Sequence, residues 1–127
     1  MPVYGLAPSR RGFTFTDDQG LRIAEIAGTE PAISAAVERI RSRRDVVLVV
    51  DEEVLRESAA LARVLGRGVA LCIVPTEVLA AARELVGLRS PSPAKTAALL
   101  ARLPSVPWLA GFLRRADPAP ESQLLLL

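Results

Sequence analysis

The sequence predicts an α/β fold: a small three-layer domain with a mostly parallel four-stranded sheet and a helical C-terminal extension. Two apolar runs without polar interruption, residues 46–50 and 69–74, have the length of buried strands. A segment with helical spacing, residues 54–65, lies between them. Because parallel strands are covered on both faces and are joined by a right-handed crossover, these three observations predict a βαβ unit.

Two further strands are predicted in the N-terminal part of the chain. Residues 3–7 form a short first strand, and residues 21–26 form a second strand after a turn at residues 16–20. A hairpin between residues 13–16 and residues 21–26 is the alternative. Thr16, with Gln three residues later, also fits a helical capping box, so this region stays ambiguous between turn and helix start.

Three helices are predicted from apolar residues spaced three and four apart. Their expected N-caps are Thr29, Asp51 and Thr76 in chain order. The expected inner faces consist of Ile33, Ala36, Val37 and Ile40, then Val54, Leu55, Ser58, Leu61, Ala62 and Leu65, and finally Val78, Leu79, Ala82, Leu85 and Val86. Residues 1–88 are therefore expected to form one α/β domain.

The composition changes at residues 89–93, where serine and proline alternate. Residues 89–116 are predicted to be the helical C-terminal extension, with a helix over residues 94–103 that begins at Ser92 and Pro93. A short amphipathic piece with the only tryptophan follows this helix. Residues 117–127 are predicted to be a flexible tail.

The extension carries the apolar side chains that suit a partner surface. They are Leu99, Leu100, Leu103, Trp108, Leu109, Phe112 and Leu113. An exposed apolar patch of this kind usually marks an interface, and a tryptophan near its centre is a typical anchor. The alternative is that the segment forms a fourth helix that closes the sheet.

The composition argues against most catalytic classes. The chain has no histidine, the commonest acid–base group and metal ligand, and no glycine-rich phosphate loop. Cys72, the one cysteine, lies within an apolar run, where a buried thiol is expected. We therefore expect a binding or structural protein, not an enzyme, with no catalytic residue, cofactor or metal.

Charge and hydropathy exclude two further classes of partner. Sixteen basic and fourteen acidic residues give a net charge of +2, which indicates no dense basic surface. The arginines within residues 39–44 fall at the end of a predicted helix, where cations favour the helix dipole, so no nucleic-acid binding is expected. No apolar run approaches the ~20 residues of a membrane span. Because a signal-peptide pattern is also absent, we expect a cytoplasmic protein without direct membrane insertion.

One edge of the predicted sheet could hold a ligand. Asp51 and Thr76 follow the two parallel strands, and open α/β sheets bind ligands at this edge. A receiver domain also places an aspartate there, but it needs an acidic pair after its first strand, where this chain has Pro8-Ser9-Arg10. Helix capping is the expected role of Asp51, and a small ligand-binding domain that uses this edge is an alternative.

Four short motifs follow one another along residues 2–76. A strand leads into Gly12-Phe13, a second strand leads into Thr29-Glu30-Pro31, an aspartate precedes the run that ends in Asp51-Glu52, and the last strand ends at Pro75. This order resembles the F subunit of V/A-type (vacuolar and archaeal-type) ATP synthases. In that family Gly-Phe usually continues as Arg-Leu-Ala-Gly in a helix, whereas Thr14 and Phe15 follow here.

The resemblance implies a non-catalytic subunit of the rotor's central stalk. Such a subunit binds the long coiled-coil D subunit inside the catalytic A/B ring, and it is peripheral to the membrane only through the complex. Its C-terminal helix would influence coupling or inhibit idle hydrolysis. We expect the partner interface to consist of Gly12, Phe13, Leu100, Trp108, Leu109 and Phe112. The alternative function is an adaptor or regulatory α/β domain of another assembly.

Overall fold

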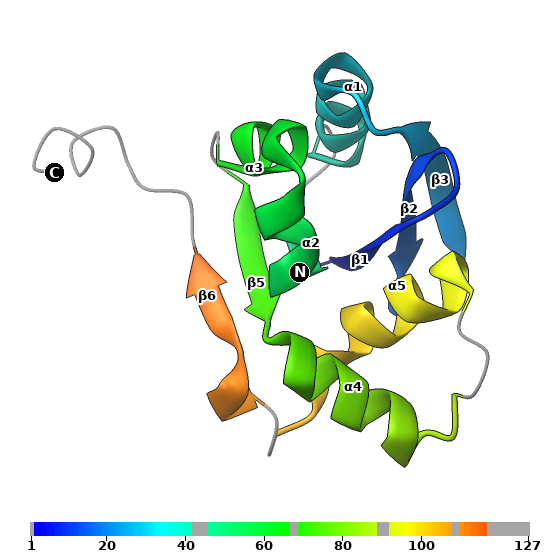
Figure 1. The fold of residues 1–127 in the computed structure, drawn as a ribbon, viewed down its shortest axis with the longest axis vertical. Coiled ribbons are helices and arrows are strands. Elements are labelled where there is room, and N and C mark those ends of the chain that lie inside the picture. The colour runs from blue at the N-terminus through cyan, green and yellow to red at the C-terminus, as the bar shows by residue number, and fades with distance from the viewer. Residues whose placement is uncertain (1, 42–45, 67–68, 89–91, 108–109, 117–127) are drawn as a thin grey trace, which may run out of the picture.

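The computed structural model describes residues 2–41, 46–66, 69–88, 92–107 and 110–116 of the chain (Figure 1). Its strands are β1 (Val3–Pro8), β2 (Gly12–Asp17), β3 (Arg22–Ala27), β4 (Val47–Asp51), β5 (Ala70–Val74) and β6 (Arg114–Ala116). They form one six-stranded sheet in the order β3-β2-β1-β4-β5-β6. The fold is α/β, as predicted, but the sheet is mixed and larger than the mostly parallel four-stranded sheet that we expected.

The parallel strands occupy the centre of the sheet. β1 pairs with β4 and β4 pairs with β5, both in parallel, and Val49 lies opposite Cys72 in the second pair. The chain passes from β4 to β5 through α2 (Glu52–Glu57) and α3 (Ala59–Leu65). The predicted βαβ unit is therefore confirmed. β1–β2, β2–β3 and β5–β6 are antiparallel pairs.

The N-terminal strands correct the predicted turn at residues 16–20. Residues 12–17 are a strand, β2, which forms an antiparallel meander with β1 and β3, so the hairpin alternative is the right one. The turn begins one residue later, because the Asp17 carboxylate accepts the backbone N–H groups of Gln19 (3.0 Å) and Leu21 (2.9 Å). Gly20 completes it at φ 86°, a conformation that glycine adopts easily.

The first helical layer consists of α1 (Glu30–Arg41), α2 and α3. Its core with the sheet includes Leu6, Phe13, Phe15, Ile33, Val37, Leu48, Leu61 and Leu65. The helix predicted over residues 54–65 is in fact two helices, because Ser58 is extended and its hydroxyl accepts the N–H of Leu61 at 3.2 Å. The break changes the inner face: Val64 is buried and Ala62 is exposed, contrary to the prediction.

The second helical layer consists of α4 (Thr76–Leu85), α5 (Pro93–Arg102) and the short helix η1 (Leu103–Ser105). Figure 1 shows α4 and α5 on the opposite side of the sheet from α1 and α3, which gives the predicted three layers. Their core includes Val47, Val49, Cys72, Val74, Leu79, Ala82, Leu100 and Leu103. The predicted inner face of α4 was too wide, because Leu85 and Val86 are exposed.

The position of α5 corrects the expected extension at residues 89–116. Ser92 caps the helix as predicted, with its hydroxyl accepting the N–H of Lys95 at 3.2 Å. The helix then packs across β1 and β2 as part of the second layer, so the alternative of a helix that closes the sheet is the right one. The chain continues through η2 (Ala110–Phe112) into β6, which extends the sheet beside β5. The predicted tail, residues 117–127, lies outside the described residues.

Candidate functional site

Of the residues predicted as a partner interface, those that the structure describes do not form one surface. Phe13 and Leu100 are buried in two core clusters on opposite faces of the sheet. Gly12 is half-buried at the start of β2, and Phe112 in η2 is 62% exposed. Trp108 and Leu109 lie outside the described residues. Leu100 and Phe13 hold the core together in the folded domain, and of the described residues in that set Phe112 alone presents a large exposed side chain.

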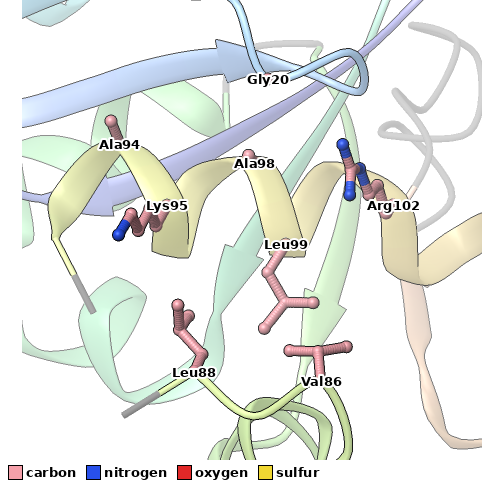
Figure 2. A pocket seen from close by; sticks show the side chains of 8 residues that line it. All are labelled: Gly20, Val86, Leu88, Ala94, Lys95, Ala98, Leu99 and Arg102. Carbon is pink, nitrogen blue, oxygen red and sulfur yellow. The ribbon is translucent and has the colours of Figure 1, made fainter. Parts of the chain in front are cut away.

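A groove lies between the end of α4 and α5. It has a volume of about 320 Å³. Figure 2 shows its lining, which comprises Gly20, Val86, Leu88, Ala94, Lys95, Ala98, Leu99 and Arg102. Because Gly87 has φ 70° and the Leu88 N–H donates to the carbonyl of Arg83 at 2.9 Å, the chain turns there and leaves Val86 beside α5.

The outer face of α5 forms one wall of this groove. Lys95, Ala98, Leu99 and Arg102 follow the spacing i, i+3, i+4 and i+7, which places them on one side of the helix. The buried residues Thr96, Ala97, Leu100 and Ala101 face the sheet on the other side. In Figure 2 the Leu99 side chain points toward Val86, and Lys95 lies above Leu88. The floor is thus apolar, with one cation toward each end of α5.

Arg102 also ties the β2–β3 turn to the groove. Its Nε donates a hydrogen bond to the backbone carbonyl of Asp18 at 3.1 Å, and Gly20 of the same turn lines the groove. Within the described ranges, ion pairs that join Arg63 to Glu30, and Arg56 and Arg114 to Glu52, lie outside the groove lining. The exposed cations of the groove are therefore placed to attract anionic groups of a ligand.

The residues of this groove were missed by the sequence analysis, apart from Leu99. The signal that could have found them is the pair Lys95 and Arg102, which stand seven residues apart around Ala98 and Leu99. That spacing describes a second amphipathic face of the helix, but only the packing of the opposite face on β1 shows that it is turned outward.

A second, smaller cavity of about 120 Å³ lies between β3 and α1. Its lining consists of Ala24, Ile26, Ala32, Ala35, Ala36, Arg39 and Ile40. Pockets for cofactors and small molecules usually have volumes of about 300 Å³ or more, so this cavity is too small for such a ligand.

The Asp51–Thr76 edge is brought together as predicted, but by internal hydrogen bonds. The Thr76 hydroxyl donates to Oδ1 of Asp51 at 2.7 Å, and the N–H of Glu53 donates to the same oxygen at 3.0 Å. Asp51 therefore caps α2, as expected, whereas Thr76 ties α4 to β4 and Pro75 occupies the N-cap position of α4. Neither of the two cavities is lined by Asp51 or Thr76.

Three comparisons with known proteins were negative: no family model, no curated protein and no solved structure matches the chain. Within the described ranges, no group of three or more His, Cys, Asp or Glu residues could hold a metal ion. In the same ranges, no helix is long and apolar enough to cross a membrane. Functional inference therefore rests on the groove and on the motifs in the sequence.

Proposed function

We propose that the protein is a non-catalytic interaction domain that binds a helix of a larger assembly, and that this assembly is the central stalk of a V/A-type rotary ATPase. The observation that carries the proposal is the apolar groove of about 320 Å³ between α4 and α5. Val86 is 62% exposed there, and Leu85 beside it is 67% exposed. Apolar grooves of this kind receive the apolar face of a partner helix.

The scaffold around the groove supports a binding role. One wall is α5, which is held against β1 and β2, and the other is the end of α4, whose Leu79 and Ala82 are buried in the second core cluster. Both walls therefore belong to the packed second layer. A groove fixed in advance binds more tightly than one that must be ordered during binding, and a rotor subunit must also keep its shape under load.

The ionisable groups of the groove suit binding better than catalysis. They are Lys95 and Arg102, both exposed to solvent. Arginine stays protonated in proteins and has no acceptor atom, so these two groups do not form an acid–base pair. At the sheet edge where a ligand site was considered, Asp51 already accepts hydrogen bonds from the Thr76 hydroxyl and from the backbone N–H of Glu53.

We place the contact with the stalk at the α4–α5 groove instead of at Gly12 and Phe13. Phe13 is 6% exposed and packs in the first core cluster, so its ring is not available to a partner. The motif at Gly12 opens a strand here, whereas the family continues it as a helix. The resemblance implies a C-terminal helix that influences coupling or inhibits idle hydrolysis, and α5 does not suit that role because it is packed on the sheet.

The arrangement of the first three strands favours a second candidate function, an adaptor domain of another assembly. The antiparallel meander of β1, β2 and β3 replaces the helix that would follow Gly-Phe in the stalk family. Both candidates use the same groove and differ in the partner that fills it.

The experiment is reconstitution with the purified coiled-coil D subunit of a V/A-type ATPase. We expect the two purified proteins to co-elute in size-exclusion chromatography. Val86→Ser should weaken the complex about tenfold, because an exposed apolar side chain is lost from the lining of the groove. Phe112→Ser, a matched change at an exposed residue outside the groove lining, should bind like the parent. If no complex forms, the stalk assignment is wrong; if Phe112→Ser alone weakens binding, the groove assignment is wrong.

A further inference from the structure

We infer that the groove recognises an acidic helix face, namely a partner helix with carboxylate side chains at positions i and i+7 and apolar residues between them. The inference deepens the proposed function, because it names the chemistry of the partner, and it rests on that function only in taking the partner to be helical. It is carried by the spacing of Lys95 and Arg102 and by the apolar surface between them.

The two cations have a defined separation. Lys95 and Arg102 lie seven residues apart in α5, which is helical from Pro93 to Arg102. An α-helix rises about 1.5 Å per residue, so the two positions are about 10 Å apart along the axis and on the same side. Two carboxylates at i and i+7 of another helix have the same separation. A partner helix that runs alongside α5 can therefore meet both cations at once.

The surface between the cations is suited to a helix that approaches closely. Ala98 is small and half-buried, and Leu99 and Val86 supply the larger apolar side chains of the floor. Packed helices lie about 8–10 Å apart, and small side chains at the contact favour the shorter distances. Apolar residues at i+3 and i+4 of the partner would meet Leu99 and Val86.

Charge complementarity favours a helix with an acidic face over an anionic lipid as the ligand of the groove. A fatty acid or a phospholipid carries its charge at one end, and it would leave one of the two cations without an anion. Lys95 and Arg102 lie toward the two ends of α5, with Ala98 and Leu99 between them along the helix, and this spacing matches two separated carboxylates. A coiled coil repeats every seven residues, so a coiled-coil stalk can present such an acidic pair as part of its regular pattern.

The probe is a synthetic helical peptide of about three heptads with leucines on one face and a Glu pair at i and i+7. Its matched control carries Lys at the two Glu positions. We expect the Glu peptide to bind about tenfold more tightly than the Lys peptide in a fluorescence anisotropy titration, and its affinity to fall as salt is added.

The decisive variant is Lys95→Glu. Ser92 already caps α5 through the N–H of residue 95, so glutamate there completes a capping box and should leave the fold intact. We expect Lys95→Glu to lower the affinity for the Glu peptide about tenfold and to raise the affinity for the Lys peptide. The matched control is Arg10→Glu, the same kind of charge reversal in the exposed loop between β1 and β2. This loop lies at the opposite end of β2 from the β2–β3 turn, which borders the groove. The control variant should change neither affinity.

Three results would overturn the inference: equal binding of the two peptides, equal effects of Arg10→Glu and Lys95→Glu, or binding of anionic vesicles without binding of the Glu peptide. The proposed function fails separately. If the stalk subunit binds but Lys95→Glu leaves its affinity unchanged, the acidic-face inference is wrong and the stalk assignment stands. If the Glu peptide binds but the stalk subunit does not, the stalk assignment is wrong and the inference stands.

Discussion

Gly5 of β1 lies directly against the backbone of α5 at Ala97. A Cβ atom added at Gly5 would stand 2.7 Å from the carbonyl carbon of Ala97 and 2.9 Å from the backbone nitrogen of Ala101. The helix therefore rests on the bare backbone of the strand, which is a recurrent reason for glycine inside a strand. Because the outer face of α5 carries Lys95 and Arg102, Gly5 helps to set the position of the groove.

Gly5→Ala should destabilise the domain because the new methyl group has to displace α5. Overpacking of this kind costs about 1–3 kcal/mol, and we expect a fall of that size in the free energy of unfolding, measured by chemical denaturation. Gly111→Ala is the matched control, since a Cβ at Gly111 meets nothing within 4 Å. If Gly5→Ala is as stable as the parent, α5 does not lie on β1 as described.

Truncation after Leu88 should unfold the domain. It removes α5 and η1, and with them Leu100 and Leu103, which are buried in the core with β4 and β5. We expect loss of the cooperative thermal transition and of dispersed amide signals in an NMR spectrum. The control is truncation after Ala116, which keeps every described element. A shortened domain that still melts cooperatively would restore the predicted boundary at residue 89.

Asp51→Ala should destabilise the domain by about 1–2 kcal/mol, because it removes the acceptor for the Thr76 hydroxyl and the cap of α2. Asp51→Asn keeps an acceptor oxygen and should cost less. Thermal denaturation of the two variants in parallel with the parent measures the difference. A ligand site that strains this edge would give the reverse result, with Asp51→Ala more stable than the parent.

Cys72 should resist alkylation in the native protein, since it is 1% exposed in the middle of β5. We expect iodoacetamide to label it only as fast as the domain opens, and to label it fully in denaturant. Mass spectrometry of timed samples gives both rates. Rapid native labelling would mean that β5 is not covered by the second helical layer.

The centre of the fold could be predicted because its strands are continuous apolar runs. Residues 46–50 and 69–74 are buried, apart from the half-buried Ala70, so these strands appear in the sequence as continuous apolar runs. The break at Ser58 was harder to foresee, because the apolar spacing passes through it and only the side-chain cap on Leu61 separates the two helices.

β2 and α5 could not be placed from local pattern. Thr14 and Thr16 resemble turn or capping residues in the sequence, yet both are buried, because α5 covers the face of β2 to which they belong. The contact between Gly5 and Ala97 joins segments that are far apart in the chain. For the same reason the groove was missed: the side of α5 that faces outward depends on the strand beneath it.

Hydrogen–deuterium exchange of the domain with and without the coiled-coil stalk subunit would locate the surface that the partner covers. We predict slower amide exchange in the complex at the end of α4, around Val86 and Leu88, and along α5 between Lys95 and Arg102. Protection confined to the edge at Asp51 and Thr76, or no change in exchange at the α4–α5 groove in a complex that forms, would mean that the partner does not occupy the groove.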